Sequence, residues 1–125
     1  MTWQNVQNNF YLQTIEKRIS SQENLSWCNQ ITDLLSADIA LLRKQQGLVL
    51  NDIGCQTMQL YKAIMSKAMP LNYVGFDIDE TYRTIAKKHI KGFTENMYNS
   101  LDITSSQPPL STYTVMSATL EHLDE

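Results

Sequence analysis

The chain is poor in the residues that mark several common classes of protein. Its 125 residues include only two cysteines, Cys28 and Cys55, with neither the spacing of a disulfide framework nor that of a zinc site. No apolar run approaches the roughly 20 residues of a membrane span, and the N-terminus MTWQNVQNNF lacks the charged and apolar zones of a signal peptide. We therefore expect a soluble, cytoplasmic protein without a metal site.

Positive charge is also scarce. Ten lysines and arginines stand against 13 acidic residues, which gives a formal net charge of -3 and an isoelectric point near 5.3. The basic residues are scattered singly or in pairs, so they provide no face that would attract a phosphate backbone. Nucleic acid is therefore not an expected partner. The length of 125 residues predicts a single domain.

Glycine and proline are missing from the first 46 residues, where the apolar residues recur with helical spacing. Two helices fit residues 1–46. In the second helix, Asn24 or Ser26 is the predicted N-cap and Gly47 the predicted end. A mostly apolar stripe, broken by Asp38, runs along this helix and consists of Trp27, Ile31, Leu34, Leu35, Leu41 and Leu42.

From residue 47 onwards, short apolar runs alternate with helical patterns. The patterns predict strands at residues 48–53, 72–77, 92–96 and 113–117, helices at 57–68 and from Asp79 or Thr81 to Lys91, and a loop at 105–111. Strands separated by such helices predict a three-layer α/β fold with a parallel sheet and two leading helices.

The stretch NDIGCQTMQL, residues 51–60, follows the first predicted strand. In an open parallel sheet, ligands bind beyond the carboxyl ends of the strands, and this turn approaches them most closely. Gly54 permits such an approach because it has no Cβ. Asp77 lies 23 positions further on and ends the second strand, where a carboxylate accepts hydrogen bonds from ribose hydroxyls in such folds.

The run LVLNDIGCQTM resembles the first motif of class I S-adenosylmethionine-dependent methyltransferases, a hydrophobic strand followed by D-x-G-x-G-x-G. Asp52 and Gly54 are retained, whereas Gln56 and Met58 replace the later glycines. YVGFDIDETYRTIAKKH resembles the second motif, and YTVMSATLEHLDE resembles the fourth strand and its turn, with Thr114 where the family commonly has Asp. The resemblance covers residues 48–125 and implies a Rossmann-like fold with S-adenosylmethionine as cofactor. It also implies that residues 47–125 are the first half of such a domain and that the helical residues 1–46 pack on or cap the cofactor site.

The resemblance also implies a site. It would place Asp77 on the ribose, Ile78 against the adenine, and Asp102 with Ile103 at the adenine edge. The other candidate cofactor-binding residues are Asp52, Gly54, Cys55 and Gln56 in the turn and Ala118 after the fourth strand. His122 and Glu121 lie where the family brings the substrate near the methyl group, and His122 is the candidate base.

Simpler structural roles compete with these assignments. Met58 is expected to pack on the sheet, Cys55 to fill apolar space, and His89 to be structural. Glu121 and His122 are equally well explained as polar residues at a helix start. Asp79 is better placed than Asp77 to cap the following helix, which leaves Asp77 free for a ligand.

The family fold normally has seven strands, and this sequence stops after the fourth. We therefore expect either a fragment or a short form whose open sheet edge pairs with another molecule, a second copy included. The predicted activity is methyl transfer to a small-molecule acceptor, a sugar hydroxyl or amine as in bacterial surface-polysaccharide biosynthesis. The alternative is a non-catalytic binding or assembly module. A nicotinamide-binding domain is less favoured because a pyrophosphate needs the missing glycines.

Overall fold

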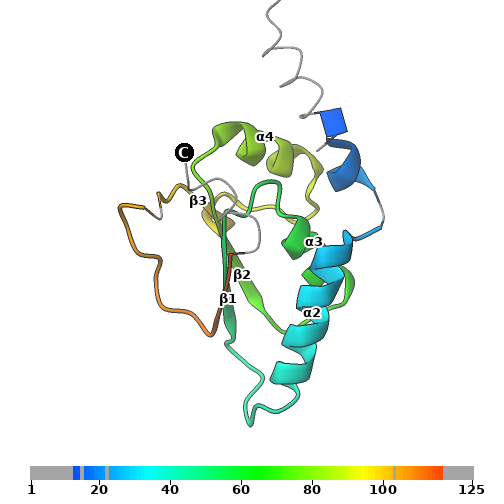
Figure 1. The fold of residues 1–125 in the computed structure, drawn as a ribbon, viewed down its shortest axis with the longest axis vertical. Coiled ribbons are helices and arrows are strands. Elements are labelled where there is room, and N and C mark those ends of the chain that lie inside the picture. The colour runs from blue at the N-terminus through cyan, green and yellow to red at the C-terminus, as the bar shows by residue number, and fades with distance from the viewer. Residues whose placement is uncertain (1–12, 15, 22, 103, 117–125) are drawn as a thin grey trace, which may run out of the picture.

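The computed structural model describes residues 13–14, 16–21, 23–102 and 104–116, which form one parallel sheet with flanking helices (Figure 1). The strands are β1 (Val49–Ile53), β2 (Asn72–Phe76), β3 (Tyr98–Asn99) and β4 (Tyr113–Val115). Their order is β3-β2-β1-β4, and each neighbouring pair runs parallel. This confirms the predicted α/β class with four parallel strands.

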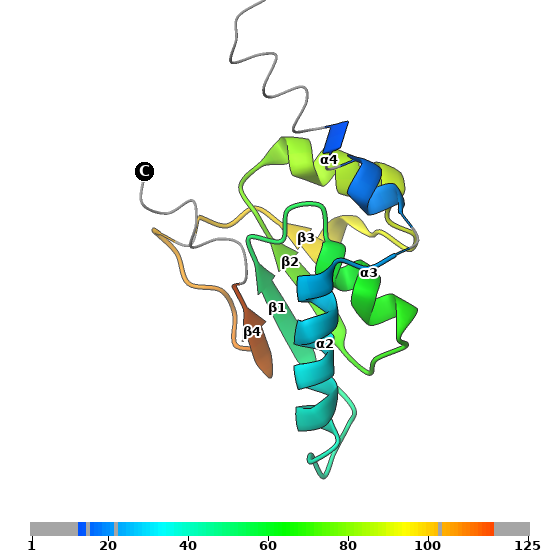
Figure 2. The same ribbon diagram turned by 45° about the vertical axis from the view of Figure 1, so that its right-hand side comes forward.

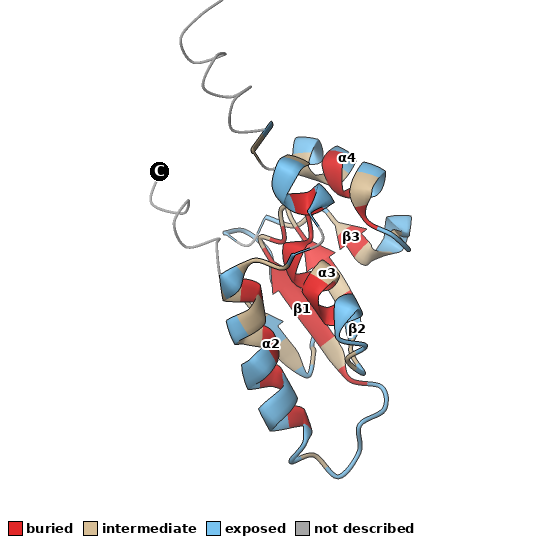
Figure 3. Cartoon of the chain, turned by 90° about the vertical axis from the view of Figure 1, so that its right-hand side faces the viewer, coloured by how far each residue is buried: buried red, intermediate tan, exposed pale blue. Residues whose placement is uncertain are grey.

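Helices α2 (Ser26–Ile39) and α3 (Gln59–Ser66) lie together on one face of the sheet (Figure 2). Leu50 of β1 and Tyr73 of β2 belong to the same buried cluster as Leu35 of α2 and Ile64 of α3. Ile19, from the helical residues 16–20 near the N-terminus, joins this cluster as well. The leading helical residues therefore share one hydrophobic core with the sheet. Figure 3 marks buried residues of β1, α2 and α3 in red.

The connection from β3 to β4 runs on the opposite side of the sheet from α2 and α3 (Figure 1). Asn51 points to this face, is 2% exposed, and donates from Nδ2 to the carbonyl of Pro109 at 2.7 Å. Thr112 N donates to the carbonyl of Val49 at 2.9 Å. Apart from residue 103, which is not described, residues 100–112 contain no helix or strand, which agrees with the loop predicted at 105–111.

Helix α4 (Glu80–His89) leads from β2 towards β3 and begins as predicted. The carboxylate of Asp79 accepts a hydrogen bond from Thr81 N at 2.9 Å and so caps one free amide of the first turn. The last turn contains the basic residues Lys87, Lys88 and His89. Positive charge at this position interacts favourably with the negative end of the helix dipole. Both ends of α4 are therefore encoded locally.

The predicted stripe and ends of α2 are partly wrong. Its fully buried side consists of Cys28, Thr32, Leu35 and Ile39, whereas Leu34 and Leu41 are 72% and 84% exposed. The cap position is Leu25, which makes no side-chain cap bond, and Asn24 instead donates to Ser66 Oγ at 2.9 Å. The helix ends at Ile39 rather than near Gly47, and Gln45 Nε2 donates to the Ile39 carbonyl at 3.1 Å.

The third strand lies later than predicted. Residues 95–97 form the 3-10 helix η1 (Glu95–Met97), and β3 follows it, so the expected strand at 92–96 is wrong. Gly92 has a φ of 82°, which suits a turn and not a strand. Pairing with β2 decides the position, since Tyr98 lies opposite Gly75 and Asn99 opposite Phe76.

No helix among the described residues is long and apolar enough to cross a membrane.

Candidate functional site

The turn after β1 has the backbone of a glycine-rich loop although it contains one glycine. Gly54, Gln56 and Met58 have φ values of 70°, 48° and 65°, all in the left-handed region that favours glycine. These are the three glycine positions of the D-x-G-x-G-x-G pattern. Helix α3 consequently starts at Gln59 and not at the predicted residue 57, with Met58 as its cap position.

Two hydrogen bonds hold Gln56 in this conformation. Gln56 N donates to Asp77 Oδ2 at 2.9 Å, and the Tyr98 hydroxyl donates to the Gln56 carbonyl at 2.6 Å. The two peptide groups on either side of the Gln56 Cα are thus fixed from β3 and from the end of β2. A left-handed non-glycine residue costs about 1–2 kcal/mol and persists where its surroundings impose it.

Tyr98 is itself held from α4. Arg83 donates from Nη1 to the Tyr98 carbonyl at 2.5 Å, and its guanidinium carbon lies 5.5 Å from the centre of the Tyr98 ring. Arg83 also contacts Glu95 at 2.6 Å, and Glu95 contacts Lys87 at 2.7 Å. The Tyr98 ring is 2% exposed, so it has little room to move relative to the turn.

Most of the amides in the turn are used within the protein. Gly54 N and Cys55 N both donate to the carbonyl of Phe76, at 2.8 and 3.0 Å, and Met58 N donates to the Cys55 carbonyl at 2.8 Å. Gln56 N is bonded to Asp77. A pyrophosphate is recognised by free backbone amides at such a turn. This turn therefore does not suit a dinucleotide.

Asp77 follows β2 directly and lies beside the turn, as the sequence predicted. Its Oδ2 accepts from Gln56 N, and its Oδ1 accepts from Asp79 N at 3.0 Å. A carboxylate oxygen has two lone pairs, so each oxygen keeps capacity for one further hydrogen bond. The next residue, Ile78, is 63% exposed. A half-buried carboxylate and an exposed apolar side chain thus stand next to each other at this edge.

Asp52 lies inside the protein instead of at its surface. It is 2% exposed, and its Oδ2 accepts a hydrogen bond from the Tyr73 hydroxyl at 2.5 Å. Burial raises the pKa of Asp52 from 3.8 to about 7; the Tyr73 hydrogen bond opposes this shift and the charge of Asp77 adds to it. Asp52 therefore supports the turn from beneath and changes its charge near neutral pH.

Cys55 is also a core residue, 5% exposed, and burial raises the pKa of its thiol well above the usual value. A Cβ added at Gly75 would lie 2.8 Å from the Cys55 sulfur. The side chain fills the space that Gly75 leaves open, so the thiol offers no contact to a ligand in solvent. Met58, which is fully buried in the core cluster, packs as expected.

The remaining predicted residues come from the carboxyl-terminal third. Asp102 is exposed, and its Oδ1 accepts from Thr104 N at 2.9 Å and from Thr104 Oγ1 at 2.5 Å, which starts a turn. These bonds lower the pKa of Asp102. Ile103, Ala118, Glu121 and His122 lie outside the described residues. Within the residues that are described, no group of three or more His, Cys, Asp or Glu could hold a metal ion.

Sequence reasoning missed Tyr73, Tyr98 and Arg83. The signal in the sequence was a tyrosine in an otherwise buried strand, because a buried hydroxyl needs a hydrogen-bond partner. The partner of Tyr98 is 42 residues away and that of Tyr73 is 21 residues away. His89, expected to be structural, lies in the last turn of α4 with Nε2 3.6 Å from a carboxylate oxygen of Glu16.

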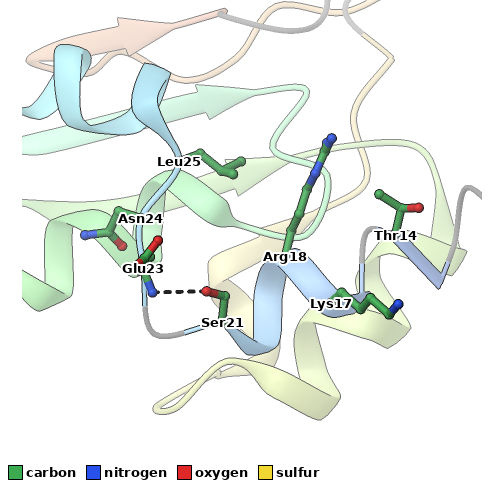
Figure 4. Close-up of a pocket in the computed structure, with 7 residues that line it drawn as sticks. All are labelled: Thr14, Lys17, Arg18, Ser21, Glu23, Asn24 and Leu25. Carbon is green, nitrogen blue, oxygen red and sulfur yellow. Dashed lines mark hydrogen bonds between the residues drawn. The ribbon is translucent and has the colours of Figure 1, made fainter.

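A separate open pocket of about 290 Å³ lies where the N-terminal helical residues meet the start of α2 (Figure 4). It is lined by Thr14, Lys17, Arg18, Ser21, Glu23, Asn24 and Leu25. Lys62 of α3 bonds to the same segment, since its Nζ donates to the carbonyls of Arg18 and Glu23 at 3.3 and 3.0 Å. None of the predicted site residues lines this pocket.

The strand order defines the class of protein. The chain runs from β1 outward to β2 and β3 on one side and returns to β4 on the other side, so the reversal lies between β1 and β4. The turn after β1 stands at this switch point, where open α/β sheets bind their ligands. The chain is a Rossmann-like α/β protein. It matches no protein-family model, no curated protein and no solved structure.

Proposed function

We propose that the chain binds S-adenosylmethionine at the carboxyl edge of its sheet and takes part in methyl transfer. The observation that carries the proposal is the left-handed backbone at positions 54, 56 and 58 beside the Asp77 carboxylate, at the switch point of the sheet. S-adenosylmethionine contains a ribose and an adenine but no pyrophosphate. Its recognition therefore requires a carboxylate for the ribose and an apolar surface for the adenine. It does not require free backbone amides, most of which are bonded within the protein in this turn.

In this proposal, Asp77 accepts hydrogen bonds from the ribose hydroxyls with its remaining lone pairs, and Ile78 packs against the adenine. The cofactor supplies a methyl group that its sulfonium makes electrophilic. The protein then mainly needs to align the acceptor. Asp52 and Tyr73 hold the turn from the core side and do not contact the ligand.

We further propose a small-molecule acceptor with a hydroxyl or amine, such as a sugar. His122 would take the proton that a hydroxyl acceptor loses, with Glu121 beside it. The support for this part of the proposal is the resemblance of YTVMSATLEHLDE to the fourth strand and turn of class I methyltransferases. The proposed role in bacterial polysaccharide biosynthesis also rests on sequence resemblance.

A non-catalytic binding or assembly module is the second candidate, and one observation favours it. Both oxygens of Asp77 accept backbone amides, from Gln56 and from Asp79, so the carboxylate would be retained for stability alone. Turnover of a methyl acceptor separates the two functions, because a binding module would hold the cofactor without transferring its methyl group.

The test is calorimetric titration with S-adenosylmethionine and S-adenosylhomocysteine, with NAD as the comparison ligand. Asp77→Asn is the informative variant, because it keeps one carbonyl acceptor for the turn while it loses the charge. We expect both S-adenosyl ligands to bind, NAD not to bind, and Asp77→Asn to weaken binding by about 1–3 kcal/mol, the scale of a hydrogen bond to a charged group.

Asp79→Asn is the matched control, because asparagine also caps helices and should leave the affinity unchanged. If Asp77→Asn and the unaltered chain bound the cofactor with equal affinity, the proposed hydrogen bonds between Asp77 and the ribose would be contradicted. Absence of binding to the folded chain would contradict the proposed cofactor.

A further inference from the structure

Gln56 has the conformation of a glycine but not its freedom. At a φ of 48°, its Cβ is close to the following carbonyl, and the residue gains by turning to a right-handed or extended conformation. Two bonds oppose that change, from Gln56 N to Asp77 and from the Tyr98 hydroxyl to the Gln56 carbonyl. We name these two hydrogen bonds the Gln56 clamp.

We propose that Tyr98 is a positioning residue, which keeps the turn at 54–58 in its ligand-binding conformation through the Gln56 clamp. The inference rests on the proposed function, since it assigns Tyr98 a part in the same site. Tyr98 is 2% exposed, so it acts through Gln56 and does not itself contact a ligand.

The surroundings of Tyr98 fit this task. Its ring lies under the Arg83 guanidinium, its carbonyl is bonded to Arg83, and its backbone pairs opposite Gly75 in the sheet. The backbone and the ring of Tyr98 are thus held in place. Its hydroxyl lies 2.6 Å from the Gln56 carbonyl oxygen and also interacts with the Cys55 thiol. Tyr98→Phe would remove the hydroxyl and leave the ring and these supports in place.

A double-mutant cycle tests the assignment, with the variants Tyr98→Phe, Gln56→Gly and the combination. Glycine takes a left-handed φ without penalty, so a turn with glycine at position 56 needs the clamp less. We expect Tyr98→Phe to weaken S-adenosylhomocysteine binding by about five- to tenfold, the order of one hydrogen bond. In the Gln56→Gly background, the same change should weaken it by less than about twofold.

Tyr61→Phe is the control, because it removes the hydroxyl of another buried tyrosine, one that belongs to α3 and not to the clamp. It should leave the affinity unchanged, and circular dichroism with thermal unfolding establishes that every variant is folded. Binding that Tyr98→Phe leaves unchanged would overturn the inference alone. An equal loss in both backgrounds would also overturn it, because Tyr98 would then act by another route.

Absence of binding to the unaltered chain would overturn the proposed function and, with it, the ligand role of the clamp. The two failures are therefore distinguishable, since the first leaves wild-type binding intact and the second does not.

Discussion

At the scale of the residue, Asp52 gives the protein a dependence on pH. Its pKa is about 7 in the folded chain, whereas an unperturbed aspartate, as in the unfolded chain, has a pKa of 3.8. Between these two pH values the folded chain therefore binds more protons than the unfolded chain. Stability therefore falls as the pH rises through this range and levels off above it. The groups facing Asp52 are Tyr73, Cys55, Cys28 and Asp77.

We expect the free energy of unfolding to fall by roughly 3 kcal/mol between about pH 5 and pH 8, on the order of 1.4 kcal/mol for each pH unit between pH 5 and the folded pKa. Asp52→Asn should remove most of this slope, because asparagine does not titrate. Urea unfolding at several pH values measures it. Asp102→Asn, at an exposed aspartate, serves as the comparison, and a persistent slope in Asp52→Asn would contradict the assignment.

The candidate site was predictable in position but not in its contacts. Gly54 and Asp77 are 23 positions apart, the basis for expecting them at one site, and the structure places the turn and the carboxylate together. Gln56 and Met58 suggested an altered turn, yet the backbone keeps the glycine conformation. The cause is non-local, because the Tyr98 hydroxyl and the Asp77 carboxylate impose it from residues distant in sequence.

At the scale of the element, β2 packs against the turn through Gly75. An added Cβ would lie 2.8 Å from the Cys55 sulfur and 3.2 Å from both the Cys55 Cβ and the Tyr73 ring. We expect Gly75→Ala to lower the free energy of unfolding by about 1–3 kcal/mol, the range for overpacking a core. Chemical denaturation measures the change.

Cys55→Ala provides the matched background, because it removes the sulfur that the new Cβ would meet. Gly75→Ala should be less destabilising there than in the unaltered chain. Equal effects in the two backgrounds would show that the contact with the sulfur is not the cause.

The elements that sequence reasoning found are those with local signals. Strand β2 is a short apolar run, and α4 has its cap at Asp79 and its basic last turn within a few residues. Strand β3 was misplaced because Tyr98 and Asn99 are defined by their pairing with Gly75 and Phe76. The buried side of α2 was misjudged because Cys28 and Thr32, two small residues, meet the core while the larger Leu34 is exposed.

At the scale of the whole molecule, Lys62 fastens the N-terminal helical residues to α3. Its ammonium donates to the carbonyls of Arg18 and Glu23, and burial lowers its pKa. Lys62→Met keeps the apolar stem and removes both bonds. We expect a loss of about 1–2 kcal/mol in stability and faster proteolysis near residues 16–23.

Lys91→Met is the control for this prediction, since Lys91 is exposed. Thermal unfolding and limited proteolysis followed by mass spectrometry provide the two measurements. Proteolysis of Lys62→Met at the wild-type rate would mean that apolar contacts, such as those of Ile19 in the core cluster, hold the segment without Lys62.

The open edge of β4 leaves one whole-molecule prediction untested. Among the described residues, β4 pairs only with β1, through Leu50, Asn51 and Asp52. Pairing of its other edge with a second copy stays a prediction, and sedimentation over a range of concentrations would measure it.

The position of β1 between β2 and β4 also predicts an order for the events of folding. The contact between Asp52 and Tyr73 closes a loop of 21 residues, whereas that between Val49 and Thr112 closes one of 63. Short loops close at a smaller loss of chain entropy, so the unit β1-α3-β2 can assemble first and β4 docks late. The turn and Asp77 lie within or next to the early unit, and the Tyr98 hydroxyl, which holds Gln56, joins them across 42 residues, fewer than the 63 that β4 needs. The nucleoside side of the proposed site would then exist before the strand that leads to Glu121 and His122 is in place.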